Sequence, residues 1–292
     1  MLLGLLVVIW AVSWPVIKIG VATVSPIWYA CLRYLIATSC LFVLVTVRGE
    51  LVVPSRSDWR LVAVSGVFQM GAYSALTALA LTILPPGRAS VLAFSTPLWV
   101  VPLAAWWLRE PVSRRSRYGV GFGLLGVLVI ASPALQQHGD GQFASYAMLM
   151  SAAAAWAISI VFVRAHRFDA SPLALAPWQS LVAVLLLAPL AAVIEGAPHA
   201  FDWRGVASLA YVGPVATAFA YWAIVEVGRE LRASTISMAL LATPSLGLLI
   251  STLTLGERVT GSLATGVLLV GAGIRLATSN PPIRSRATER SA

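Results

Sequence analysis

The stretch that decides the fold reads WAVSWPVIK at residues 10–18, and it returns as WAISIVFVR at residues 156–164. Each copy opens on tryptophan, alanine, an aliphatic residue and serine, and each ends on a basic residue. Further matches follow in the same order, at offsets of 144 to 147 residues: Ser25-Pro26 with Ser171-Pro172, Asp58-Trp59-Arg60 with Asp202-Trp203-Arg204, Thr96-Pro97 with Thr243-Pro244, and Glu110 with Glu257. Because the order is kept and the drift is small, the chain is predicted to be an internal duplication.

Composition predicts a membrane protein. The chain is 59% hydrophobic and only 11% charged, with a mean hydropathy of +0.86, which is too apolar for a soluble domain. Runs of about 20 apolar residues, long enough to cross a bilayer, recur throughout the sequence. Ten spans are expected: 3–20, 26–47, 60–83, 88–108, 117–134, 143–164, 172–193, 204–225, 233–254 and 261–278.

The expected fold class is therefore an all-α integral membrane protein with ten transmembrane helices, built as two five-helix repeats. The first repeat covers residues 1–134, the second covers residues 143–279, and residues 280–292 are expected to form a disordered tail. An odd number of spans forces the second repeat to enter the bilayer from the opposite side. Inverted repeats of this kind are typical of secondary transporters.

Basic residues predict the orientation. Fifteen of the 20 Lys and Arg residues fall in the connections after the even-numbered spans and in the C-terminal region, against four on the other side. Because Lys and Arg collect on the cytoplasmic side, both termini are expected to be cytoplasmic. The net charge of +9 then reflects topology and contact with lipid headgroups. No basic stripe interleaved with aromatic residues favours a nucleic-acid partner.

The duplication, with Leu255-Gly256-Glu257 closing the ninth span before a short last one, resembles the drug/metabolite transporter superfamily and its EamA-type members. The first-repeat counterpart, Leu108-Arg109-Glu110, lacks the glycine but keeps the glutamate. The resemblance covers residues 1–279 and is strongest to bacterial inner-membrane amino-acid exporters. It implies export of aromatic and other bulky neutral amino acids.

Two prolines interrupt equivalent spans. Pro97 and Pro244 each follow threonine, and each frees the carbonyl four residues earlier and bends its helix. Kinks near the middle of the membrane are where inverted-repeat transporters place sites and gates, so these prolines are candidate hinges. Alternatively, they only set packing angles.

Polar side chains recur every four residues in the third span, a spacing that keeps them on one side of a helix. They are Ser65, Gln69, Tyr73 and Thr77, and Thr217 and Tyr221 occupy matching positions in the eighth span. Such groups should face the protein interior, because exposure to hydrocarbon is costly. They are expected to line a cavity for a zwitterion, unless they only join helices together.

Three of the 11 tryptophans, Trp10, Trp99 and Trp156, lie well inside spans. Trp10 and Trp156 are repeat equivalents, so their indoles should occupy related places and could stack on an aromatic substrate. Packing is the alternative. Phe94, Ser95 and Met238, on the kinked spans, are weaker candidates for the same cavity.

Arg33 is the only formal charge well inside a span. It could extend outward to the interface, pair with a carboxylate, or bind the carboxylate of a substrate. Its repeat equivalent is Gln179, so symmetry does not demand a charge.

No Asp or Glu lies at the centre of a span, and the three histidines lie in or beside connections. Proton relays generally need an intramembrane carboxylate or histidine, so facilitated diffusion or exchange is favoured over tight proton coupling. Glu110 and Glu257 are interpreted as structural residues that order two turns. Gly119 and Gly123 are expected to allow close helix packing, in a scaffold or an oligomer surface.

Other functional classes find little support in the sequence. A metalloprotease or an intramembrane aspartyl protease would need motifs that are absent, and no cofactor or metal is expected. A receptor or assembly factor has no evident use for an inverted duplication. Within transport, a nucleotide sugar, a lipid-linked sugar or a small drug remains an alternative cargo, but a nucleotide sugar would want several cavity cations.

Overall fold

The computed structural model describes residues 1–136, 141–198, 202–231 and 233–278. The expected tail at residues 280–292, together with His138 and His199, lies outside the described residues. The described chain forms helices without β-strands: α1 (Leu2–Val21), α2 (Pro26–Val47), α3 (Arg56–Val64), η1 (Ser65–Ala72), α4 (Tyr73–Ile83), α5 (Pro86–Ala93), α6 (Thr96–Trp107), α7 (Arg114–Gln136), α8 (Gln142–Ala165), α9 (Pro172–Ile194), α10 (Trp203–Tyr211), η2 (Val212–Phe219), α11 (Ala220–Glu230), α12 (Ala233–Leu240), α13 (Ala242–Leu255) and α14 (Gly261–Thr278).

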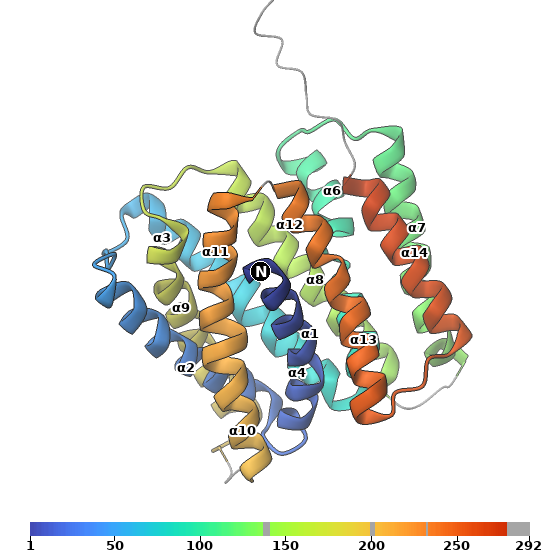
Figure 1. Cartoon of the computed structure of the whole chain (residues 1–292), viewed down its shortest axis with the longest axis horizontal. Helices are drawn as coiled ribbons and strands as arrows, with labels where there is room; N and C mark the ends of the chain where they lie inside the picture. Colours follow the sequence, from blue (N-terminus) through green and yellow to red (C-terminus); the bar gives the residue numbers. More distant parts are fainter. Residues whose placement is uncertain (137–140, 199–201, 232, 279–292) are drawn as a thin grey trace, which may run out of the picture.

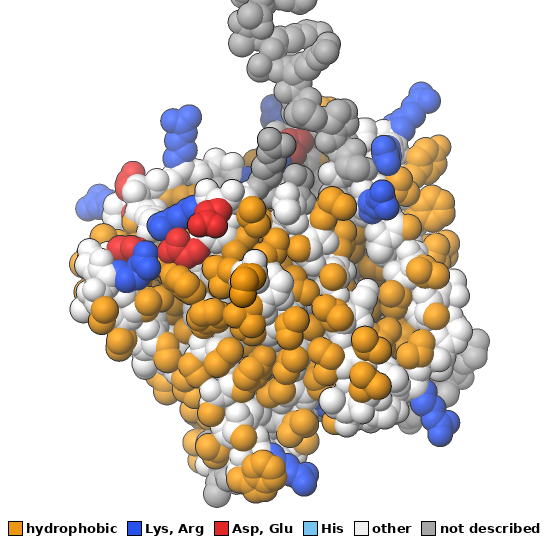
Figure 2. Space-filling view, viewed as in Figure 1, with side chains coloured by type: hydrophobic (Ala, Val, Ile, Leu, Met, Phe, Trp, Pro, Cys, Tyr) orange, Lys and Arg blue, Asp and Glu red, His pale blue; other side chains and the backbone are white. Residues whose placement is uncertain are grey.

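These helices make ten membrane-spanning stretches among the described residues, so the expected all-α fold with ten spans is confirmed. Four of the spans are composite: α3–η1–α4, α5–α6, α10–η2–α11 and α12–α13. Apolar side chains cover the middle of the molecule, Lys and Arg side chains lie toward its upper and lower ends, and the visible Asp and Glu side chains lie toward the upper end (Figure 2). This distribution matches a protein whose belt faces lipid.

Local sequence explains where the helices begin. Ser25 and Ser171 are N-cap residues, and the proline that follows each one stands in the first turn, where its missing N–H costs nothing. The third and eighth spans begin earlier than expected, at Arg56 and Trp203, because Ser55 and Asp202 are their N-cap residues. Asp58 completes a capping box, and Asp202 accepts from the N–H of Gly205 at 2.9 Å. That backbone bond holds the pKa of Asp202 below its ordinary value.

The packing of the two halves repeats with the halves exchanged. Helix α1 packs against α13, and its counterpart α8 packs against α6. Helix α2 likewise packs against η2, and α9 packs against η1, while α2 and α9 pack against each other (Figure 1). Each of these contacts therefore has a partner contact in which first-repeat and second-repeat elements change places.

The glycines of α7 and α14 bring these two helices into close contact at one edge of the molecule (Figure 1). A Cβ atom added at Gly119 would collide with the backbone nitrogen of Ala277, and one added at Gly123 would collide with the side chain of Leu98 on α6. Both glycines are buried. They therefore serve intramolecular packing in this structure, and an oligomer surface would have to use other residues.

Candidate functional site

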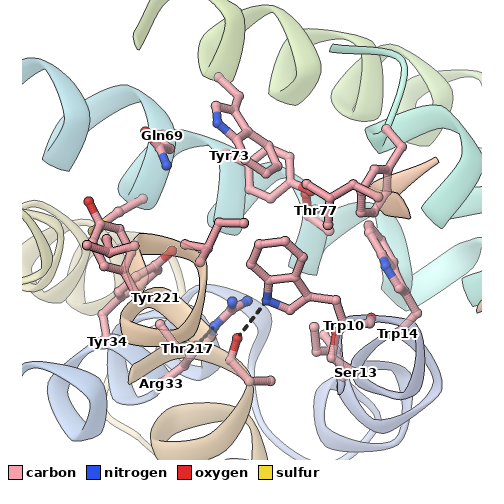
Figure 3. A pocket seen from close by; sticks show the side chains of 18 residues that line it. Trp10, Ser13, Trp14, Arg33, Tyr34, Gln69, Tyr73, Thr77, Thr217 and Tyr221 are labelled. Carbon is pink, nitrogen blue, oxygen red and sulfur yellow. Dashed lines mark hydrogen bonds between the residues drawn. The ribbon is translucent and has the colours of Figure 1, made fainter. Parts of the chain in front are cut away.

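A cavity of about 450 Å³ lies between helices of both repeats (Figure 3). Its walls come from α1, α2, η1, α4, α8, η2, α11 and the ends of α5 and α12. Eighteen side chains line it: Trp10, Ser13, Trp14, Ile17, Arg33, Tyr34, Gln69, Met70, Tyr73, Thr77, Phe94, Trp156, Ala216, Thr217, Tyr221, Ile224, Val225 and Leu240. The volume falls in the range of about 300–1,000 Å³ that is typical of small-molecule sites.

Nine of the twelve residues expected at a substrate site lie on this wall: Trp10, Arg33, Gln69, Tyr73, Thr77, Phe94, Trp156, Thr217 and Tyr221. The other three do not line it. Ser95 is fully buried in the break between α5 and α6, Trp99 lies further along α6, and Met238 is 70% exposed. Leu240 takes the place expected for Met238, because two residues rotate a helix by about 200°.

The sequence reasoning missed several wall residues that a known signal could have found. Ser13, Trp14 and Ile17 follow Trp10 at helical spacings of three, four and seven residues, so they share its face of α1. Tyr34 adjoins Arg33 and also lines the cavity. No sequence pattern pointed to Met70, Ile224 or Val225, which are ordinary apolar residues of spans.

Two of the polar wall residues, Gln69 and Thr217, come from two π-helical segments, one in each repeat. The segments η1 and η2 begin at Ser65 and Val212, which are 147 residues apart. A π turn holds more residues than an α turn, so it changes which side chains share one face of the helix. In this way the segments carry Gln69 and Thr217 to opposite sides of the cavity. No sequence pattern indicated these turns.

Hydrogen bonds hold η2 against α1 and α2. The indole N–H of Trp10 donates to the carbonyl of Ala216 at 3.1 Å, which is the dashed line in Figure 3. The Nε–H of Arg33 donates to Oγ1 of Thr217 at 2.8 Å, and that hydroxyl donates to the carbonyl of Val212 at 2.8 Å. Two side chains that face the cavity are thus fixed to the same π-helical segment.

Neighbouring residues bind two further polar groups of the wall, whereas Oγ1 of Thr77 is buried without a hydrogen-bond partner. Oε1 of Gln69 accepts from the hydroxyl of Ser159 at 3.1 Å, and Ser65 contacts the same serine at 3.0 Å. The hydroxyl of Tyr221 donates to Oε1 of Gln179 at 3.1 Å. Ser65, expected within the polar stripe, therefore joins η1 to α8 instead of lining the cavity.

Aromatic rings form most of the remaining wall. Tyr73 and Trp156 pack edge to face, with ring centroids 4.8 Å apart and an interplanar angle of 73°. Trp14 and Phe94 lie 6.4 Å apart on the other side. Trp10 also lines the cavity, and its indole lies near the centre of the view in Figure 3. The equivalent tryptophans of the two repeats therefore do face one cavity.

Arg33 is the only charged side chain on the wall of this cavity. Within the described part of the chain, the ion pairs join Arg48 with Glu50 and Glu226, Arg229 with Glu226, and Arg164 with Glu110. Arg33 makes none of them, although its guanidinium lies 5.4 Å from the ring centre of Tyr34. No cluster of three or more His, Cys, Asp or Glu that could hold a metal occurs among the described residues.

The helix breaks lie just before the two expected hinge prolines. Helix α5 ends at Ala93 and α6 begins at Thr96, whereas α12 ends at Leu240 and α13 begins at Ala242. The hydroxyl of Thr96 donates to the carbonyl of Ala93, which Pro97 leaves without an N–H donor, at 3.0 Å. Oγ1 of Thr243 is buried without a hydrogen-bond partner. The two breaks are thus equivalent in sequence but differ in hydrogen bonding.

The two equivalent glutamates also have different partners. The carboxylate of Glu257 accepts from the N–H groups of Gly87 and Arg88, at 2.7 and 3.1 Å, and from the hydroxyl of Ser251 at 2.5 Å. It therefore caps the start of α5. Glu110 instead pairs with Arg164 at 2.7 Å, with 39% of its side chain exposed.

Similar proteins agree with this architecture. A "Probable amino-acid metabolite efflux pump" of Salmonella typhimurium is 26% identical over 92% of this chain and 91% of its own length. A "Probable terminal-alkyne amino-acid exporter" of Streptantibioticus cattleyicolor is 28% identical over 94% and 91% of the two chains. A crystal structure of a protein with 21% identity superposes with a TM-score of 0.61 over 99% of both chains, which shows the likeness of the folds.

The sequence model of one family covers almost the whole of the helical region. It matches residues 1–132 and residues 144–279, the two segments on either side of the α7–α8 connection. The match agrees with the ten apolar spans and with the resemblance seen in the sequence. The chain therefore belongs to the EamA-like transporter family.

Proposed function

We propose that this protein exports amino acids with aromatic or other bulky side chains, and their carboxylate derivatives, across the bacterial inner membrane. The observation that carries the proposal is the guanidinium of Arg33, which faces an aromatic-walled cavity and has no acidic partner among the described residues. A guanidinium matches the geometry of a carboxylate, and flat indole rings can receive a bulky side chain. The relatives named as amino-acid efflux proteins support this cargo and its direction.

Each wall residue has a role in this proposal. Arg33 binds the carboxylate, and Trp10, Trp156 and Tyr73 surround the side chain. Gln69 and Tyr221 contact the polar remainder of the substrate. Pockets that combine apolar walls with a few placed polar groups orient their ligands in this manner.

Transport proceeds by alternating access between two inverted five-helix repeats, residues 1–134 and 143–279. The exchanged packing of α1 on α13 and α8 on α6 supports this symmetry. The breaks before Pro97 and Pro244 act as hinges, because Phe94 and Leu240 border both a break and the cavity. In the present state, α5 is packed against α13, whereas its counterpart α12 has no such packing against α6 among the described residues.

Transport does not require a proton gradient in this proposal. The wall of the cavity carries no Asp, Glu or His, the groups on which proton relays generally depend. Facilitated diffusion or exchange then moves the substrate down its own gradient. Both termini lie in the cytoplasm, as the excess of Lys and Arg in the connections after the even-numbered spans supports.

Reconstituted vesicles test the proposal. The purified protein should accelerate the flux of labelled phenylalanine and tryptophan more than that of alanine, and it should leave a nucleotide sugar such as UDP-glucose unmoved. Replacing Gln69 or Tyr73 by alanine should reduce the flux while the protein still folds and inserts. Preferential movement of UDP-glucose, a lipid-linked sugar or a hydrophobic drug would assign another cargo class. If none of these substrates moved, a receptor or assembly factor would become the better interpretation.

A further inference from the structure

The cavity carries a net positive charge that nothing in its wall neutralises. Of its 18 residues, Arg33 alone is charged. A ligand with a net negative charge would therefore be held more strongly than a neutral ligand of the same shape, because the low-dielectric surroundings strengthen the interaction. This charge imbalance bears on which carboxylates the protein prefers.

The acidic residues are engaged elsewhere. Nine of the 11 Asp and Glu residues are described, and eight of them accept hydrogen bonds or form ion pairs away from the cavity wall. These eight are Glu50, Asp58, Glu110, Asp169, Glu195, Asp202, Glu226 and Glu257. The ninth, Glu230, is exposed at the end of α11. Within the described chain, none is placed to receive the ammonium group of a substrate in this cavity.

The orientation of Arg33 leaves its terminal nitrogens for a ligand. Its Nε–H is bound to Thr217, whose hydroxyl is itself tied to the carbonyl of Val212. This chain fixes the guanidinium plane between Trp10 and Thr217 at the edge of the cavity (Figure 3). The two terminal nitrogens have no hydrogen-bond partner among the described residues, and they can bind both oxygens of a carboxylate. Thr217 is thus a positioning residue for this contact.

The wall offers an ammonium only neutral acceptors, such as the unpartnered Oγ1 of Thr77, and these compensate its charge less than a carboxylate would. Oε1 of Gln69 already accepts from Ser159, and the hydroxyl of Tyr34 accepts from Ser74 at 3.1 Å. In an α-amino acid the ammonium sits one carbon from the carboxylate, so docking the carboxylate on Arg33 brings the ammonium close to the guanidinium. Like charges in a desolvated site repel each other, and an unpaired buried ammonium is costly.

We infer that the cavity selects among carboxylates by net charge. It binds monoanions whose amino group is absent or acylated more tightly than the zwitterionic amino acid with the same side chain. This inference rests on the proposed function and names the preferred class within it. The specificity-determining residues are Arg33, which supplies the charge, and Thr217, which aims it.

Binding to the purified protein in lipid nanodiscs tests the inference, with calorimetry as the readout. Four probes share one phenyl side chain: phenylalanine, phenylpropionate, N-acetylphenylalanine and the neutral N-acetylphenylalanine amide. We expect phenylpropionate and N-acetylphenylalanine to bind about tenfold tighter than phenylalanine, a ratio that corresponds to about 1.4 kcal/mol. Equal or tighter binding of phenylalanine would overturn the inference and leave the proposed function standing. If UDP-glucose bound and none of the four probes did, the proposed function itself would fail.

The second repeat supplies the substitution that isolates the charge, since Gln179 occupies the position equivalent to Arg33. Arg33→Gln should weaken the binding of phenylpropionate and N-acetylphenylalanine about tenfold or more. It should change the affinity for the neutral amide by less than about twofold. Arg48→Gln is the matched control, because Arg48 is paired with Glu50 and Glu226 and does not line the cavity, so all four affinities should stay unchanged. Unchanged anion affinity in Arg33→Gln would refute the role of Arg33.

Thr217→Val keeps the test decisive if Arg33→Gln does not fold. Valine has nearly the shape of threonine but cannot accept from Nε of Arg33. Thr217→Val should selectively weaken the binding of the two anions, by a smaller factor than Arg33→Gln does. If Thr217 had a purely structural role, its replacement would weaken the binding of all four probes alike.

Discussion

Replacing Glu257 by glutamine should destabilise the protein far more than the same change at its repeat equivalent, Glu110. The carboxylate of Glu257 is 8% exposed and accepts from two backbone N–H groups at the start of α5 and from Ser251. Glutamine keeps one acceptor oxygen, but it turns an amide N–H toward one of these donors. One buried backbone donor is then left without a partner.

The magnitude follows from these contacts. A hydrogen bond to a charged group contributes about 1.5–3 kcal/mol, and a negative charge at a helix N-terminus adds about 0.3–1 kcal/mol. We therefore expect Glu257→Gln to lower the free energy of unfolding by about 3 kcal/mol. Glu110 pairs with Arg164 where the side chains are 39% and 47% exposed, and exposed pairs contribute about 0–1 kcal/mol.

Thermal unfolding in detergent measures the difference. A cost of about 3 kcal/mol should lower the midpoint by about 5 °C for a chain of this size, while Glu110→Gln should lower it by about 1 °C. Ser251→Ala removes only the hydroxyl donor, so it should lower the midpoint by an amount between those of the two glutamate variants. Equal shifts for the two glutamates would refute the reasoning that a buried helix cap distinguishes them.

Three further outcomes follow from the packing and from the cavity. Gly119→Leu should lower the free energy of unfolding by at least about 3 kcal/mol, because the leucine side chain meets the backbone of α14. Gly121→Leu places its side chain in open space and should change the free energy of unfolding by less than about 0.5 kcal/mol. Loss of correctly folded protein in both variants would contradict this expectation. Trp10→Leu should shift the ratio of phenylalanine to leucine flux at least about threefold toward leucine, and an unchanged ratio would remove the indole from the side-chain site. Phenylalanine flux into vesicles, down its own gradient, should persist when a protonophore collapses the pH difference. Complete loss of that flux would contradict transport without a proton gradient and make Glu226 the candidate for a titratable pair.

The glutamate pair illustrates the division between what can be predicted and what cannot. Their places at the ends of two equivalent spans predict that both residues are structural and order the turns that follow. Nothing in the local sequence distinguishes a glutamate that caps α5 from one that pairs with Arg164. That difference depends on how the halves pack in the present conformation.

The cavity shows the same division at the level of single residues. Helical spacing and repeat equivalence pointed to Trp10, Gln69, Tyr73 and Thr217, because side chains that recur on one helical face meet the same neighbours. Its position on a kinked span made Met238 a weaker candidate for the same cavity, whereas Met238 is exposed. A shift of one or two residues at a helix break changes which side chain faces inward. Because a break interrupts the regular helical period, the sequence pattern does not predict that shift.

The sequence by itself determined the ten spans, the duplication pattern and the residue types available for a site. These properties follow from hydrophobicity and periodicity, which act over one helix at a time. Only the tertiary structure decided that two π-helical segments present Gln69 and Thr217 to a shared cavity, and that Arg33 is held by Thr217 and not by a carboxylate. Contacts between residues 184 positions apart depend on how whole helices pack against each other, and no local pattern encodes that packing.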